Sequence, residues 1–158
     1  MTTTTSVLPA FLNAIQTALD AEAALDGVNV LSGPAGPLEL GIEYVALAIG
    51  EIGLAQSWGA QETRYKKEDY SIPCELHART AGAGEAAIRA ARARAFALLA
   101  VVEDVLRTAL SPPGPPFGIA AIDACQVEDV RFGQGFVDNE RTATVQFDIT
   151  ARTSLISA

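Results

Sequence analysis

Apolar and polar positions alternate along this chain with two different periodicities, and each predicts a different kind of secondary structure. Between Val7 and Leu25 apolar side chains recur every three or four residues, which predicts an amphipathic helix. Its buried stripe is Leu8, Phe11, Leu12, Ile15 and Leu19. Ser6 can cap the start of this helix, and Gly27 is typical of its end.

A longer helix is predicted from Gly84 to Leu110. Its core face has the same spacing and consists of Ile88, Ala91, Ala95, Leu99, Val102, Leu106 and Ala109. On the other face Glu85 precedes Arg89, and Glu103 precedes Arg107, by four residues, an order that stabilises a helix surface. We therefore expect that face to contact solvent or a partner.

Strict alternation predicts strands in other segments. From Tyr70 to Ala78 the apolar face consists of Tyr70, Ile72, Cys74, Leu76 and Ala78. Pro73 lacks a backbone N–H, which predicts a free edge or a bulge at that point. Two shorter strands are predicted at Val28–Leu31 and Ile42–Ile49.

The chain closes with two more strands. The first, Ile119–Phe132, loses its alternation near Cys125, which predicts a bulge. A turn is expected from Gly133 to Arg141, with Gly135, Asp138 and Asn139 as turn formers. The last strand, Thr142–Ser154, turns alternate apolar side chains inward: Ala143, Val145, Phe147, Ile149 and Ala151.

A long polar segment, Gly50 to Asp69, carries Trp58, Tyr65 and a basic cluster of Arg64, Lys66 and Lys67. Segments of this length are often functional or become ordered on a partner. Two interpretations are open here: a functional connection or one ordered by a partner, or a flexible hairpin extension. Trp58 is the side chain that we most expect to contact a partner, the alternative being a local anchor that folds the segment back.

These elements predict an α+β fold in the order α-β-β-β-α-β-β. We expect a mixed, mostly antiparallel sheet of four or five strands with two main helices on one face. The 158 residues predict a single domain, 1–158, with a flexible N-terminus at 1–6. A hydrophobic fraction of 49% with 19% charged residues excludes intrinsic disorder.

The net charge of −8 is unfavourable for binding nucleic acid, although DNA can move past an acidic protein surface without being retained. The start of the chain has no basic region of a signal peptide, and the apolar stretch Ala93–Val102 is too short to span a bilayer. We expect a soluble protein with no membrane contact.

Cys74 and Cys125 have no metal-ligand spacing. Cys74 is expected in the core, and Cys125 in the core or partly exposed at the bulge.

One segment imitates a nucleotide site, because Gly82-Ala83-Gly84 follows a strand and opens a helix. Alternation in that strand and the charge of Glu85 at the helix start both argue against a dinucleotide fold, so a plain glycine turn is favoured.

His77, the single histidine, is expected on the surface without a catalytic partner. We therefore predict no enzyme activity, no catalytic residue, no cofactor and no metal.

The whole order of elements resembles the tail terminator (tail completion) proteins of long-tailed bacteriophages and gene transfer agents. The resemblance lies mainly in the charged segment Arg64–Asp69, the strand Tyr70–Ala78 and the long helix directly after it. It implies a virion protein at the junction of tail and head, assembled in the host cytoplasm. Such proteins form a hexameric ring on the last ring of the tail tube.

The ring in that family halts growth of the tube and presents the surface that joins the head connector, while DNA passes through the lumen without specific binding. The implied partners are therefore further copies of the chain, the tail tube protein and a head–tail connector or neck protein. The acidic charge and the edge strands available for pairing between subunits are compatible with such a ring. We expect Trp58, Arg64, Lys66 and Lys67 at an interface. The alternatives are a head–tail connector protein, or a nucleotide-binding enzyme built on Gly82–Gly84.

Overall fold

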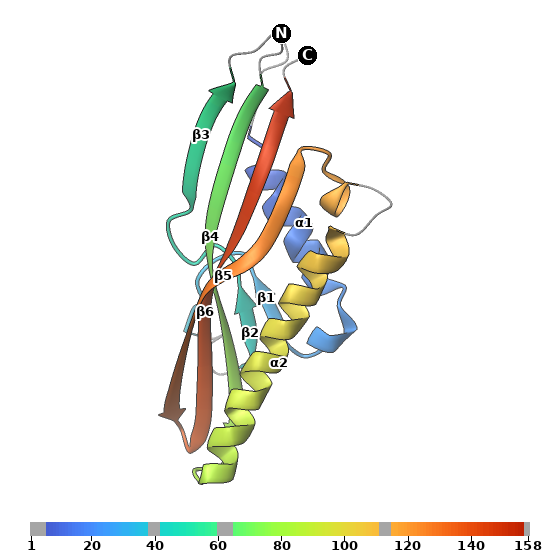
Figure 1. Ribbon diagram of the computed structural model, residues 1–158. Helices are drawn as coiled ribbons and strands as arrows, with labels where there is room; N and C mark the ends of the chain where they lie inside the picture. Colours follow the sequence, from blue (N-terminus) through green and yellow to red (C-terminus); the bar gives the residue numbers. More distant parts are fainter. Residues whose placement is uncertain (1–5, 38–41, 60–64, 111–114, 157–158) are drawn as a thin grey trace.

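Two helices lie on one face of a six-stranded, mostly antiparallel sheet (Figure 1). The computed structural model describes residues 6–37, 42–59, 65–110 and 115–156. The predicted α+β class is confirmed. The sheet has one strand more than expected because the segment after Gly50, interpreted as a polar connection or a flexible hairpin extension, contains a strand that pairs with the next one.

The first helix, α1 (Leu8–Asp20), ends earlier than the sequence pattern predicted. A separate 3-10 turn (Ala23–Leu25) follows, and the Glu22 side chain caps it by accepting from the Ala24 N–H. Gly27 has a φ of +79°, so it ends this short turn and not the α-helix. The N-cap residue is Val7, which makes no side-chain cap, and Ser6 Oγ just before it accepts from the Leu8 N–H at 3.2 Å.

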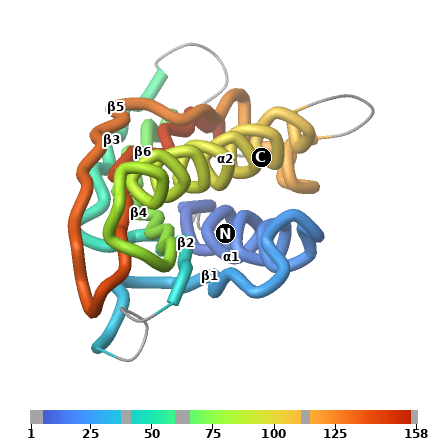
Figure 2. The backbone as a smooth tube through the Cα atoms, turned by 90° about the horizontal axis from the view of Figure 1, so that it is seen from below, coloured from blue at the N-terminus to red at the C-terminus, as the bar shows by residue number. Residues whose placement is uncertain are grey.

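The second helix, α2 (Glu85–Ala109), starts after Gly84 as predicted and lies beside α1 (Figure 2). Its buried stripe consists of Ala87, Ala91, Ala95, Leu98, Leu99, Val102, Val105 and Leu106. Ile88 and Ala109 are only half-buried at the rim. Three of the eight buried side chains are alanines, which let the helix approach the sheet closely.

The sheet has the strand order β1-β2-β4-β6-β5, and β3 pairs with β4 beside β2. The strands are β1 (Asn29–Leu31), β2 (Tyr44–Ala46), β3 (Gly53–Gly59), β4 (Tyr65–Ala81), β5 (Ile122–Val137) and β6 (Glu140–Ile156). Only β1 and β2 pair in parallel. The frame is the long pair β4–β6, whose register runs without a shift from Tyr65–Ile156 to Ala81–Glu140.

Strands β2 and β3 lie one after the other along the same side of β4, and Pro73 occupies the gap between them. The Ile49 N–H donates to the Pro73 carbonyl at 2.9 Å, so the backbone of Pro73 faces this gap. No partner strand needs an N–H there, which confirms the local free edge expected from the sequence. Strand β2 stops at Ala46, well before Ile49, and the chain turns at Ala48 with a φ of 56°.

The turn between the last two strands is much shorter than predicted. Only Asp138 and Asn139 separate β5 from β6, and both have positive φ values, 51° and 62°, as in a tight two-residue hairpin. Gly133 and Gly135, interpreted as turn residues, lie within β5 instead. Register shifts between Ile122 and Ala124 and between Glu128 and Arg131 confirm a bulge close to Cys125 and add a second one.

The core lies between the sheet and the two helices. The inward faces predicted for the two central strands are confirmed, since every one of their apolar members is at most 5% exposed. Phe11, Ile15 and Leu19 of α1 complete this core with no exposed surface. Among the described residues, no helix is long and apolar enough to cross a membrane.

Candidate assembly interface

Strand β3 and the last part of β5 are edges of the sheet at opposite ends of the molecule (Figure 1). Both carry exposed large apolar side chains. On β3, Leu54 is 44% exposed and Trp58 is 63% exposed. At the far end of β5, Phe132, Phe136 and Val137 are 39%, 47% and 50% exposed. Rows of this kind on strand edges are typical of contacts between protein chains.

Trp58 is partly held by its own subunit and partly free to contact another. It lies opposite Lys66 of β4, whose Nζ is 5.9 Å from the centre of the indole ring. A cation at this distance attracts the ring face. The contact with Lys66 fits the local-anchor interpretation, although Trp58 is 63% exposed and leaves surface available to a partner. Its contact with a partner stays a prediction.

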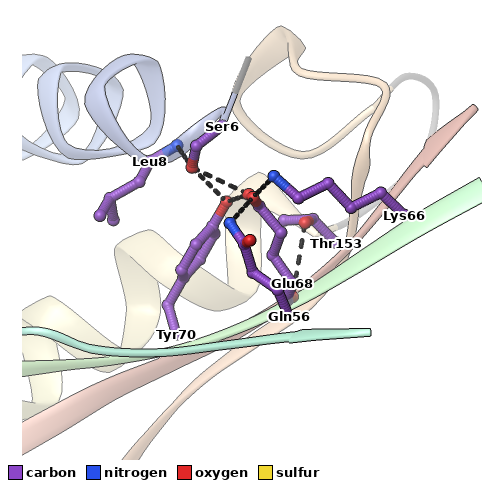
Figure 3. A network of polar contacts seen from close by, with 7 residues as sticks. All are labelled: Ser6, Leu8, Gln56, Lys66, Glu68, Tyr70 and Thr153. Carbon is purple, nitrogen blue, oxygen red and sulfur yellow. Dashed lines mark hydrogen bonds and ion pairs between the residues drawn. The ribbon is translucent and has the colours of Figure 1, made fainter. Parts of the chain in front are cut away.

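A buried carboxylate stabilises the end of the sheet where β3 lies (Figure 3). Glu68 has no exposed surface and accepts hydrogen bonds from Ser6 Oγ at 2.8 Å, from Gln56 Nε2 at 2.9 Å and from the Tyr70 hydroxyl. Lys66 Nζ lies 2.5 Å from the same carboxylate. We call these five residues the Glu68 cluster. Burying a charge without such partners is costly, so each donor matters.

The pKa shifts in the Glu68 cluster follow from this arrangement. Burial alone raises the pKa of Glu68, but hydrogen bonds from Lys66, Tyr70 and Ser6 outweigh it, so the pKa lies below its usual range. Burial and the hydrogen bond to Glu68 raise the pKa of the Tyr70 phenol. At neutral pH the carboxylate is therefore charged and pairs with the Lys66 ammonium. Ser6 connects the start of α1 to this end of the sheet.

The structure does not bring the predicted basic residues together. Lys66 is 7% exposed on the helix side of the sheet, whereas Lys67 points to the opposite face and is exposed. Arg64 lies outside the described residues. Neighbouring residues of a strand point to opposite faces, which separates Lys66 from Lys67. The role of these residues at an interface stays a prediction, and the charge of Lys66 is already paired with Glu68.

Sequence reasoning missed the Glu68 cluster, although a signal was present. Lys66, Glu68 and Tyr70 occur at every second position and continue the inward face of the strand predicted from Tyr70. Opposite charges at adjacent inward positions are typical of a buried ion pair at the end of a sheet. The signal was not used because the segment was interpreted as a connection.

At the opposite end, residues 131–146 form a hairpin arm from the end of β5 and the start of β6. Phe132 contacts Phe96 of α2, with ring centroids 5.3 Å apart. Gln134 Nε2 donates to the Ile88 carbonyl of α2 at 3.3 Å. Both contacts lie on the helix side of the sheet, so that side of the arm is held against the first half of α2.

The glycine turn before α2 lacks the setting of a dinucleotide site. Strand β4 pairs antiparallel with each of its neighbours, so the turn is not part of a parallel strand–helix–strand unit. The Ala83 carbonyl accepts from the Arg141 guanidinium at 2.8 Å, and Glu85 lies in the first turn of the helix. Gly82 has a φ of +101°, which explains the glycine by backbone geometry.

His77 is half-buried, whereas the sequence analysis expected it on the surface. Its ring stacks on Tyr44 with centroids 5.3 Å apart, and Nδ1 lies 3.1 Å from Thr144 Oγ1. Burial and the charge of Arg79 lower the pKa of His77, so the imidazole is neutral at pH 7. Within the described ranges, no three His, Cys, Asp or Glu side chains are grouped closely enough to hold a metal.

Both cysteines are buried and unbridged. Burial raises the pKa of Cys74 to about 12 and that of Cys125 to about 11. Neither thiol therefore forms a reactive thiolate at neutral pH. The expected place of Cys74 in the core is confirmed, and Cys125 is in the core as well.

No protein-family model matches this chain, and no curated protein matches it. Among solved structures, 21 chains match. One of them belongs to a structure described as "Virion of native gene transfer agent (GTA) particle". That match has 21% sequence identity and a TM-score of 0.50, and it covers 93% of this chain and 98% of the other. The similarity shows that the two chains share a fold over nearly their whole lengths.

Proposed function

We propose that this chain is a structural virion protein that forms a ring on the end of a tail tube, stops its growth and joins the tail to the head connector. The observation that carries the proposal is the fold shared with a chain of a gene transfer agent virion particle across 93% of this sequence. The predicted order of elements supports it independently, because it resembles the tail terminator family.

The surface of the chain also supports a role in assembly. The uncharged edge strand β3, the charge-free end of β5 from Phe132 to Val137, and the exposed aromatic rings on both suit contacts with two neighbours. We propose that these neighbours are further copies of the chain, six in a ring. The faces of the ring then contact the tail tube protein on one side and a connector or neck protein on the other.

The charge of the chain suits a lumen through which DNA moves. A net charge of −8 repels the phosphate backbone, so DNA passes without being retained. The proposed role needs no chemistry, and it places the protein at the tail–head junction of the particle after assembly in the host cytoplasm.

Deleting the gene in cells that produce the particle tests the proposal directly. The terminator role predicts tail tubes beyond their normal length together with heads that lack tails, as seen by negative-stain microscopy. Tails of normal length that fail to join heads would favour a connector role instead. Intact particles in normal numbers would overturn both.

A further inference from the structure

Two segments of the sheet edge lack the features that normally prevent strands from pairing with other chains. Edge strands usually carry charges, prolines or bulges, or are very short. Strand β3, Gly53–Gly59, contains no charged residue and no proline. The end of β5 from Phe132 to Val137 also lacks both, and its register beyond the second bulge is regular. In the part of the chain that the structure describes, neither segment has a strand on its outer side.

The backbone of β3 shows which groups face outward. Because the Pro73 carbonyl faces the β2 and β3 side, odd-numbered residues of β4 direct their backbone groups to that side. These residues pair with odd-numbered residues of β3, as Ser71 does with Gly53. The N–H and C=O groups of the even-numbered residues, Leu54, Gln56 and Trp58, therefore face the free edge.

The same reasoning applies to the end of β5. The Ser154 N–H donates to the Ala121 carbonyl, so even-numbered residues of β6 direct their backbone groups to β5. Thr144 and Thr142 of β6 pair with Gly133 and Gly135, whose groups therefore point inward. The outward groups belong to even-numbered residues here too: Phe132, Gln134 and Phe136.

The two segments also match in length, direction and side chains. Each has seven residues, 53–59 and 131–137, of which Arg131 at the end beside the bulge is the one charged residue, and the two run in opposite directions within the sheet. With Gln56 opposite Gln134, each large side chain of β3 faces an aromatic ring, in the pairs Leu54–Phe136 and Trp58–Phe132. On the other face small residues meet, in the pairs Ala55–Gly135 and Ser57–Gly133. Aromatic and aliphatic pairs on one face stabilise antiparallel strands.

We propose that β3 of one copy pairs antiparallel with residues 131–137 of a second copy, with Gln56 opposite Gln134. This inference rests on the proposed ring and identifies the strands that join its members. Three outward residues on each side would form hydrogen-bonded pairs, so the two sheets become continuous and their helices lie on the same side. The contact is head-to-tail, because the two segments lie on opposite edges of every copy.

The proposed register sets the relative position of neighbouring copies. Gln56 lies beside Glu68 of β4, whereas Gln134 lies at the level of Ala78, through Ala143 of β6. At about 3.3 Å per residue these two levels are roughly 33 Å apart along the strands. A neighbour is therefore shifted along the strand direction, and the strands of a closed ring must incline to its axis.

Disulfide trapping tests the register. In the variant Ser57→Cys/Gly133→Cys the two thiols would face each other across the contact as a non-hydrogen-bonded pair, at a Cα separation of about 4.5 Å that permits a disulfide. Both sites tolerate the change, since Ser57 is exposed and a Cβ at Gly133 meets no atom within 4 Å. The native thiols are buried and have raised pKa values, so they do not compete.

We expect the double variant, oxidised after assembly, to run as a ladder of covalent multimers on a non-reducing gel. Each single variant should stay monomeric on the same gel. The pair Ser57→Cys/Gln126→Cys is the matched control, because Gln126 lies on β5 before the second bulge, and it should not cross-link. Dimers from a single variant, or rings that form without a 57–133 bond, would overturn this interface and leave the proposed ring intact.

A second pair of variants tests the backbone contact itself. Gln134→Pro removes an outward N–H while leaving the hydrogen bonds between β5 and β6 in place. We expect assembly to weaken by about tenfold or more, measured by light scattering, because an interface hydrogen bond and its neighbours are lost. Gln134→Ala loses the same side chain but keeps the N–H, and should assemble nearly as the parent does. Equal assembly of the two variants would overturn the strand pairing, and a chain that forms no ring alone or on tube ends would overturn the proposed function as well.

Discussion

The two ends of the long β4–β6 pair reach stability by different means. At one end the Glu68 cluster buries a carboxylate and an ammonium group among hydrogen-bond donors. At the other end the hairpin arm rests on α2 through Phe132 and Gln134, in contacts that remain partly exposed. The first end depends on a complete set of polar partners, whereas the second depends on several weak contacts.

This difference separates the effects of mutation on folding from those on assembly. When a buried charge loses its partner, the free energy of its desolvation is no longer offset by the pairing. The end of the sheet at Glu68 is therefore sensitive to single substitutions. A half-exposed aromatic contact contributes little to folding, because much of its surface remains in water. Changes in the hairpin arm should therefore leave the subunit folded and act mainly on the contact between copies.

The largest effect is expected for Glu68→Ala. Removal of the carboxylate leaves the buried Lys66 ammonium without its partner, which we expect to lower the free energy of unfolding by about 3–5 kcal/mol. Urea denaturation followed by circular dichroism measures this. The matched control is Asp69→Ala on the next residue, which breaks an exposed ion pair with Arg152 at 2.9 Å and should cost far less. Equal losses for the two variants would mean that the cluster does not stabilise this end.

The stability of the chain should also depend on pH through Glu68. Its folded-state pKa lies below the ordinary value of 4.5, so its contribution is complete above that pH and is lost as the pH falls through the folded-state pKa. We expect Glu68→Gln to be less stable than the parent at about pH 7 and the gap to narrow towards about pH 3. A gap that stays constant across this range, in urea titrations at several pH values, would contradict the lowered pKa.

The smallest effect on folding, and a large one on assembly, is expected for Phe132→Ala. The tilted ring contact with Phe96 is half-exposed, so its loss should lower the free energy of unfolding by about 1 kcal/mol. Phe96→Ala removes the same ring contact but leaves the row of side chains on β5 unchanged. Only Phe132→Ala should strongly reduce the mass of the assembled particle in light scattering. If both variants reduce it equally, the contact with α2 is what matters for assembly.

The sequence was sufficient where one physical effect determined the outcome. Alternation identified the inward faces of β4 and β6, because a one-residue slip would have placed Ile72 or Phe147 in solvent. Proline and glycine positions identified the limits of α2. In these segments burial, propensity and chain direction all favour the same structure.

The sequence was insufficient where two effects compete. Strand β3 carries no strong apolar alternation, since Ala55, Gln56 and Ser57 separate its two large side chains, and it forms because β4 offers an edge for pairing. The glycines at 133 and 135 normally favour turns, but the paired β6 keeps them extended. The alternation of Lys66, Glu68 and Tyr70 signals part of the Glu68 cluster, but Ser6, just before α1, and Gln56 of β3 join it only through distant pairing that no local pattern contains.

The unequal spacing of strand partners along the chain has a consequence for the order in which the sheet forms. Strands β5 and β6 are joined by two residues, so their pairing closes a very short loop. In contrast, β6 pairs with β4 between residues 59 positions apart at Ala81–Glu140 and 91 positions apart at Tyr65–Ile156. Long loops close slowly, so we expect the hairpin to form early and β4 to join it late. During that interval the edge of β6 that later pairs with β4 is open and its apolar face is uncovered, so the chain is most vulnerable to aggregation until β4 pairs.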